Sequence, residues 1–112
     1  MSTYTKVTPN SYDALQIALA AQPISISIEA DTNYFQSFTS GVLTNAFACG
    51  TTIDHAVLAV GYGVYNDINY FLVKNSWGSG WGIDGYVRIE ANSSNSGMGV
   101  CGIQSGPLYP TV

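Results

Sequence analysis

A five-residue segment, Ile24–Ile28, alternates isoleucine with serine without interruption. Successive side chains of a β-strand point to opposite faces, so this period of two places the isoleucines on one face and the serines on the other. Such a strand needs a sheet that is buried on one face. Just before it, Pro23 prevents any upstream helix from continuing into the strand. The chain therefore has to change its secondary structure at this proline.

The residues upstream of this proline predict a helix over residues 12–21. Asn10 or Ser11 can cap its N-terminus, and Asp13 in the first turn favours the helix dipole. The apolar residues that we expect this helix to bury are Leu15, Ile17, Ala18 and Leu19.

Three later segments have the composition of strands. Residues 55–62 predict a buried strand, residues 70–74 its hairpin partner across a loop at 63–69, and residues 85–90 a third strand. No internal repeat and no interdomain linker interrupts this pattern. We therefore predict one domain over residues 1–112 with an α+β fold, in which a helix packs at one end of an antiparallel β unit.

Composition limits the partners of such a domain. Hydrophobic residues make up 46% of the chain, which is enough for a core, whereas charged residues make up 9% and the net charge is −4. Without a basic surface to neutralise phosphates, no nucleic acid partner is expected. No stretch reaches the ~18 apolar residues of a membrane span, so no membrane association is expected either.

The two cysteines, Cys49 and Cys101, lack a C-x-x-C spacing, and the chain has a single histidine. These residues do not provide the ligands of a usual zinc site, so neither a metal nor a cofactor is expected. A structural disulfide between the cysteines is the favoured interpretation. The alternative makes Cys49 a nucleophile close to His55 in sequence, although no Gly-Ser-Cys-Trp type of helix start surrounds it.

The single histidine, His55, is a candidate general base. A catalytic imidazole directs one ring nitrogen to the group it deprotonates while an acceptor holds the other nitrogen. Asn75 could be that acceptor if the two residues face each other on adjacent antiparallel strands. Trp77 could cover their hydrogen bond, and Trp81 could help to shape a bend beside it. Taken alone, His55 could instead be an ordinary histidine with a satisfied hydrogen bond, and Asn75 a turn residue.

These candidates lie within a series of short segments whose order resembles the papain-like cysteine peptidases, the family of papain and cathepsin L. The segments are Gln22-Pro23-Ile24-Ser25, Ser40-Gly41-Val42, Cys49-Gly50, Asp54-His55-Ala56-Val57, Val60-Gly61-Tyr62-Gly63, Lys74-Asn75-Ser76-Trp77-Gly78-Ser79-Gly80-Trp81-Gly82, Gly85-Tyr86-Val87-Arg88-Ile89 and Cys101-Gly102-Ile103. The resemblance covers nearly the whole chain, but it is to the C-terminal lobe of that family only.

The resemblance implies a two-lobed enzyme in which this lobe is a barrel-like antiparallel sheet with one N-terminal helix. By this resemblance His55 is the catalytic base, Asn75 its orienting partner and Trp77 the shield over their contact, with Trp81 in support. It also implies a disulfide between Cys49 and Cys101. The residues that it assigns to substrate binding, chiefly in the main specificity pocket, are Ser27, Ile53, Asp54, Ala56 and Gly106.

The chain departs from the family pattern in one respect. Family signatures place the nucleophilic cysteine ~130 residues or more before the histidine, whereas only 54 residues precede His55 here. The cysteine and the oxyanion-hole glutamine would have to come from a cysteine-bearing N-terminal lobe, either a separate chain or the missing part of a precursor. We therefore expect a cysteine-type endopeptidase lobe that hydrolyses peptides or proteins through an acyl-enzyme when combined with that partner and is inactive alone.

A noncatalytic binding or scaffold protein that retained the lobe is the alternative function. A second polypeptide with a cysteine at a helix start, co-purifying in equal amount, would favour the peptidase. The family resemblance implies a lysosomal, vacuolar or secreted location. Asn92-Ser93-Ser94 is an N-glycosylation triplet, which makes Asn92 a candidate glycan site.

Overall fold

A computed structural model of the 112-residue chain describes residues 3–30, 33–44, 53–91 and 99–111. The elements in chain order are β1 (Thr3–Lys6), α1 (Tyr12–Leu19), β2 (Ile24–Ile28), α2 (Asn33–Gln36), β3 (His55–Tyr65), β4 (Ile68–Lys74), β5 (Tyr86–Glu90), the 3₁₀ turn η1 (Val100–Gly102) and β6 (Leu108–Thr111). The strands form one sheet in the order β1-β6-β2-β3-β4-β5, and all these neighbours pair antiparallel. The predicted α+β class and the antiparallel sheet are confirmed.

The sheet has a buried face at the place where the isoleucine pattern predicts one. The side chains of Ile24, Ile26 and Ile28 are almost completely buried, and the serines between them are partly exposed. Antiparallel pairing with β3 sets Ile28 opposite His55. The register between β2 and β3 therefore places the candidate base, His55, next to the end of the buried isoleucine strand.

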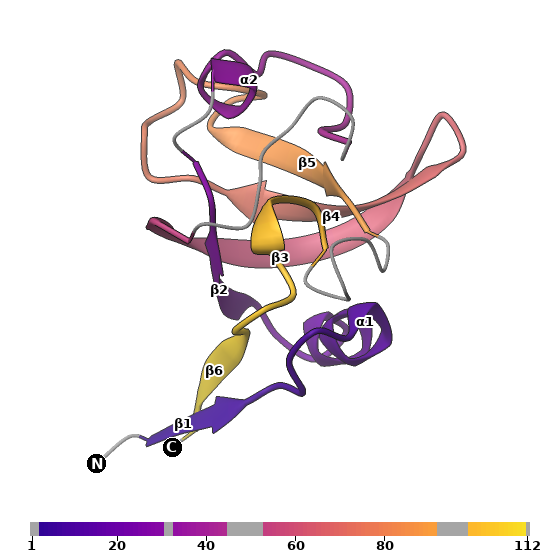
Figure 1. Ribbon diagram of the computed structural model, residues 1–112, viewed down its shortest axis with the longest axis vertical. Helices are drawn as coiled ribbons and strands as arrows, with labels where there is room; N and C mark the ends of the chain where they lie inside the picture. Colours follow the sequence, from indigo (N-terminus) through magenta and orange to yellow (C-terminus); the bar gives the residue numbers. More distant parts are fainter. Residues whose placement is uncertain (1–2, 31–32, 45–52, 92–98, 112) are drawn as a thin grey trace.

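Helix α1 lies at one end of the sheet and α2 at the other (Figure 1). Ser11 caps α1, since its hydroxyl accepts the N–H of Ala14 at 3.1 Å, and the helix buries Leu15 and Leu19. The expectation that Ile17 is buried is wrong: its side chain is 74% exposed. In this short helix Ile17 is on the face that points away from the sheet.

The β3–β4 hairpin differs from the sequence prediction. The expected loop at 63–69 is a two-residue turn, Asn66 and Asp67, and Tyr65 pairs directly with Ile68. Both turn residues have positive φ, 48° and 64°, which asparagine and aspartate tolerate and which suits the twist of a tight hairpin. The strands are therefore longer than predicted.

Four elements have no counterpart in the sequence prediction: β1, β6, the single turn α2 and the 3₁₀ turn η1. β1 and β6 pair with each other and lie side by side at one edge of the sheet (Figure 1). Ser25 opposite Leu108 is the register pair that joins β6 to β2. Within the described residues, no helix is long and apolar enough to cross a membrane.

Candidate active site

Two adjacent strands bring His55 and Asn75 together. His55 begins β3, and Asn75 follows Lys74, the last residue of β4. The register of these strands runs from Tyr65 opposite Ile68 back to Leu58 opposite Lys74, so both residues lie at the same end of the hairpin. His55 Nε2 is 2.8 Å from Asn75 Oδ1.

The amide oxygen of Asn75 has a second donor that fixes its identity. The backbone N–H of Ser76 donates to Asn75 Oδ1 at 2.7 Å. A backbone N–H can only donate, so the atom that faces His55 is the amide oxygen and not the amide nitrogen. His55 Nε2 must then carry the proton that it donates. In the neutral ring Nδ1 is left as the basic nitrogen, which is the tautomer a general base needs.

Asn75 is itself held from two sides. Its side chain is only 5% exposed, and its backbone N–H donates to the carbonyl of Gly85 at 3.0 Å, which ties the end of β4 to the start of β5. This return of the chain depends on Gly82, whose φ is +61° and where a Cβ would lie 2.5 Å from the carbonyl oxygen of Tyr86. A glycine is therefore needed at position 82 for a steric reason.

One polar atom of this site has no partner within the described residues: Nδ2 of Asn75 is buried and makes no hydrogen bond. The orienting contact therefore depends entirely on the amide oxygen. A buried unpaired N–H costs free energy, and such groups concentrate at functional sites.

Aromatic rings cover one side of the pair. The Trp77 ring centroid lies 5.3 Å from that of His55 at an interplanar angle of 35°, and the indole is 41% exposed. Trp81 does not contact His55 in this way; it packs edge-on against Trp77 at 5.2 Å. Phe35, which the sequence prediction missed, contacts both tryptophans from α2. A single helical turn has no periodicity by which the sequence could reveal it.

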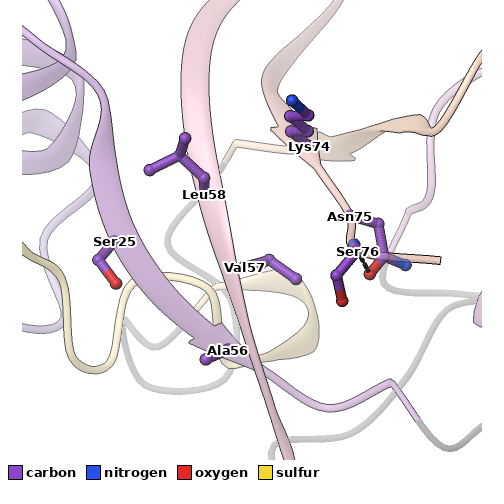
Figure 2. Close-up of a pocket in the computed structure, with 7 residues that line it drawn as sticks. All are labelled: Ser25, Ala56, Val57, Leu58, Lys74, Asn75 and Ser76. Carbon is purple, nitrogen blue, oxygen red and sulfur yellow. Dashed lines mark hydrogen bonds between the residues drawn. The ribbon is translucent and has the colours of Figure 1, made fainter. Parts of the chain in front are cut away.

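The five residues assigned to substrate binding do not line a single cavity. Asp54 lines a small hollow of about 180 Å³ with His55 and Trp77, whereas Ala56 lines another of about 370 Å³ with Asn75 and Ser76 (Figure 2). The remaining members are placed as follows: Ser27 pairs with Ala56 across β2 and β3, Ile53 is exposed beside Asp54, and Gly106 lines a separate hollow next to Pro107.

The carboxylate of Asp54 has a structural contact of its own. Its Oδ1 accepts the N–H of Ala30 at 2.9 Å, and the Asp54 N–H donates to the carbonyl of Ile28 at 3.1 Å. These bonds join the residue before His55 to the chain that leaves β2. Asp54 therefore fixes the wall of the hollow beside the imidazole.

Two predicted features lie outside the described residues. Cys49 and Asn92 fall in segments that the structure does not describe, so the disulfide and the glycan site stay predictions. Cys101, on η1, is completely buried. In the part of the chain that is described, no group of three or more His, Cys, Asp or Glu side chains could hold a metal ion.

Comparison with known proteins shows which family has a similar sequence and fold. A model of the papain family cysteine proteases matches residues 1–111. Germination-specific cysteine protease 1 of Arabidopsis thaliana is 46% identical over 107 residues, which is 96% of this chain and 28% of the relative. Papaya proteinase 4 of Carica papaya is 45% identical over 105 residues, 94% of this chain and 29% of the relative.

Solved structures agree with these sequence matches. The bromelain protease of Ananas comosus, solved with the E64 inhibitor, superposes with a TM-score of 0.90 and 41% identity, over 97% of this chain and 49% of that chain. A cysteine protease of Carica candamarcensis gives a TM-score of 0.86 and 45% identity, over 96% and 47%. The chain thus spans less than a third of the curated relatives and about half of these solved chains.

Proposed function

The chain belongs to the papain family of cysteine proteases and corresponds to their C-terminal lobe, and on this premise we propose that it supplies the catalytic base of a cysteine endopeptidase. His55 is the base, and Asn75 is the residue that orients it. The observation that carries the proposal is the bond from His55 Nε2 to Asn75 Oδ1, 2.8 Å long, whose donor and acceptor are fixed by the N–H of Ser76.

The proposed reaction follows from this arrangement. His55 Nδ1 takes the proton of a cysteine thiol, and the thiolate attacks the carbonyl carbon of a peptide bond. The imidazolium then returns the proton to the leaving amine, which gives an acyl-enzyme. In the second half of the reaction His55 removes a proton from water, the hydroxide displaces the thiolate from the acyl group, and the carboxylic acid is released. Asn75 keeps Nε2–H bonded throughout, so the ring does not have to reorient between the steps.

A cysteine-bearing N-terminal lobe would supply the thiol and the oxyanion donors, and we propose that it docks beside the candidate pair. The hollow in Figure 2 is lined by Ala56, Leu58, Lys74 and Asn75. Leu58 is 38% exposed although it lies in the middle of the sheet, as expected for a side chain that another apolar surface covers. Without the partner this chain has a base and no nucleophile, so it is inactive alone.

The finer assignments are part of the same proposal. Ser27, Ile53, Ala56 and Gly106 contribute to the substrate cleft, and Asp54 supports its wall through the bond to Ala30. The substrates are peptides or proteins. Trp77 limits the access of water to the bond between His55 and Asn75, with Trp81 behind it.

The proposal also includes a disulfide and the cellular location that it suits. Cys49 and Cys101 form a disulfide, which would close a long loop and stabilise the fold. A disulfide of this kind suits a vacuolar, lysosomal or secreted protein.

A chimeric enzyme tests this proposal directly. The corresponding part of papaya proteinase 4, which is 45% identical, is replaced by this chain, and hydrolysis of a fluorogenic peptide is measured. We expect the chimera to hydrolyse the peptide and its His55→Ala variant to fold but to lose activity by at least about 10³-fold, as removal of a catalytic base does. A folded chimera whose activity survives His55→Ala would refute the proposal.

The isolated chain provides the complementary test. We expect it to hydrolyse no peptide and to show no labelling of Cys49 by an active-site thiol probe. Labelling at Cys49 would instead support the alternative in which that cysteine is the nucleophile. Intact mass measured with and without reduction checks the disulfide: reduction should add the mass of two hydrogens.

A further inference from the structure

A groove between α1 and β3 lies outside the candidate active site. α1 packs against β3 (Figure 1), and a hollow of about 440 Å³ remains between them. The residues that line it are Asp13, Gln16, Ile17, Ala20 and Tyr62. Tyr62 lies seven positions beyond His55 on the same strand, which at about 3.3 Å per residue is a separation of roughly 20 Å. The groove is therefore distinct from the pair formed by His55 and Asn75.

The helix side of the groove is a single stripe of side chains. Positions 13, 16, 17 and 20 are spaced by three and four residues, so their side chains lie one above another on one face of α1. A different face of the same helix buries Leu15 and Leu19. Ile17 is 74% exposed because it is on the groove stripe and not on the face that contacts the core. It gives the groove an uncovered aliphatic wall.

The strand side of the groove is the aromatic ring of Tyr62. Tyr62 pairs across the hairpin with Phe71, so the two side chains are on the same face of the sheet. Phe71 is completely buried and its ring centroid lies 6.3 Å from that of Tyr12 on α1, which identifies this face as the one that α1 covers. Tyr62 is nevertheless 45% exposed. Part of its ring is therefore left open to solvent beside the helix stripe.

The charge of the groove is negative. Among the described residues that line it, Asp13 is the one ionised side chain; it is exposed in the first turn of α1 and forms no ion pair with any described residue. None of the three basic residues of the chain lines the groove, and the net charge of the chain is −4. An unpaired carboxylate beside an aromatic face and an aliphatic wall is complementary to a cation on an apolar stem.

We propose that this groove binds an arginine side chain of a polypeptide partner. The planar guanidinium lies on the ring of Tyr62 and donates hydrogen bonds to the carboxylate of Asp13. The amide oxygen of Gln16 is a further acceptor beside it, and the methylene stem of the arginine packs on Ile17. The site goes beyond the proposed function and does not depend on the role of His55, because the two sites share no residue.

The chain itself contains a contact of this kind. The guanidinium of Arg88 lies 4.4 Å from the ring centroid of Tyr65, and it donates a hydrogen bond to the carbonyl of Gly41 at 3.3 Å. A guanidinium on a tyrosine face with an oxygen acceptor at its edge is thus a geometry that this sheet supports. Arginine suits the groove better than lysine, because an ammonium group is more strongly hydrated and cannot lie flat on a ring.

The test is an NMR titration of the full 112-residue chain at one fixed ionic strength. The probe is a short capped peptide with a single arginine between two glycines, and its control has citrulline in place of the arginine. Citrulline has the same length and shape but no charge. We expect the arginine peptide to move the backbone signals of α1 and of Tyr62, with a dissociation constant of about 1–10 mM. We expect the citrulline peptide to bind at least about fivefold more weakly.

Three variants separate the groove from general attraction to an acidic chain. Asp13→Asn removes the charge and Tyr62→Leu removes the ring while keeping an apolar side chain, and we expect each to weaken binding about two- to fivefold. Asp84→Asn is the matched control: Asp84 is also exposed, and its substitution changes the net charge by the same amount, but it does not line the groove. Asparagine also tolerates its φ of 53°. We expect binding to Asp84→Asn within about 1.5-fold of the wild type.

Each possible failure has a distinct appearance. The proposal is wrong if no signal moves at about 50 mM arginine peptide, or if the signals that move lie away from α1 and Tyr62. It is also wrong if the citrulline peptide binds as tightly, or if Asp84→Asn weakens binding as much as Asp13→Asn. Circular dichroism checks the fold of each variant. If Tyr62→Leu does not fold, Asp13→Asn decides the test, because its substitution is confined to the surface.

Discussion

Replacement of Asn75 by alanine should leave stability nearly unchanged although it removes a buried side chain from the centre of the site. In most cores the loss of a buried side chain with two hydrogen bonds destabilises the fold clearly. Here three features of the site act against that outcome. Both bonds share a single acceptor atom, Oδ1; the buried Nδ2 has no partner in the described residues; and the donors that lose their acceptor can reach water once the amide is gone.

The magnitude follows from these contacts. The bonds from His55 and from Ser76 contribute about 1 kcal/mol each, so their loss lowers the free energy of unfolding by roughly 2 kcal/mol. The substitution also removes the buried Nδ2, which has no partner in the described residues, and a group of that kind costs about 1–3 kcal/mol. After the truncation both abandoned donors can reach water through the space that the amide leaves, since Ser76 is exposed and His55 is only half-buried. The expected net change is within about 1 kcal/mol of zero.

Urea unfolding followed by tryptophan fluorescence measures this difference, with Asn69→Ala as the control. Asn69 is on the same strand, β4, but is exposed, so its truncation should also be nearly neutral. Exchange of the His55 Nε2–H should nevertheless become much faster in Asn75→Ala and stay unchanged in Asn69→Ala. A loss of stability above about 3 kcal/mol in Asn75→Ala would refute the reasoning, because it would mean that Nδ2 contributes a strong interaction of its own.

Three further substitutions test other parts of the fold, each by thermal or urea unfolding. Arg88→Lys should lower stability by about 0.5–1 kcal/mol, because the guanidinium lies 4.4 Å from the ring centroid of Tyr65 and a lysine cannot stack in the same way; an unchanged midpoint would contradict that contact. Gly82→Ala should cost about 1–3 kcal/mol or more, since φ is +61° and the new Cβ would meet the carbonyl of Tyr86; a neutral result would show that the loop can relax. Ser11→Ala should cost about 1 kcal/mol through loss of the helix cap, and Ser11→Asn should restore most of it.

Local patterns in the sequence were sufficient for the parts of the fold that depend on neighbouring residues. The Ile24–Ile28 alternation predicted a strand with one buried face, and Pro23 predicted that the helix before it ends. The tight hairpin was missed because the glycine at position 63 was taken as part of a loop. The true turn is Asn66 and Asp67, two residues that also tolerate a positive φ.

The missed elements depend on partners that are distant in the sequence. β1 and β6 pair residue 3 with residue 111, and a four-residue strand carries too little pattern to be recognised before its partner is known. The Pro110 in β6 also argues against a strand, but Tyr4 of β1 pairs opposite it in a ribbon that lies at the edge of the sheet. The contacts of Phe35 with Trp77 and Trp81 were missed for the same reason, since they span more than forty positions.

The candidate pair shows how far a sequence can predict a site. A separation of twenty residues across a hairpin permitted His55 and Asn75 to face each other, since antiparallel strands can bring such residues to one end, and in the structure the two side chains are 2.8 Å apart. The sequence could not predict which atom of the amide faces the ring. That depends on the N–H of Ser76, whose direction is set by the backbone as it leaves β4. The tautomer of His55 therefore depends on the tertiary structure and cannot be predicted from the sequence.

Because His55 and Asn75 are already bonded to each other within this lobe, a cysteine-bearing partner does not have to order them when it docks. The hydrogen bond and the ring contact of the imidazole come from Asn75 and Trp77, which lie on the chain that continues directly from β4, and the N–H of Ser76 in the same segment holds the Asn75 amide. If these side chains were ordered only on docking, the interface would lose about 0.5–1.5 kcal/mol of binding free energy for each one that it immobilised. Because they are ordered beforehand, that free energy remains available to hold the lobes together, and the partner has only to bring its thiol to Nδ1. Substitutions that disorder Trp77 should therefore weaken docking as well as slow the reaction.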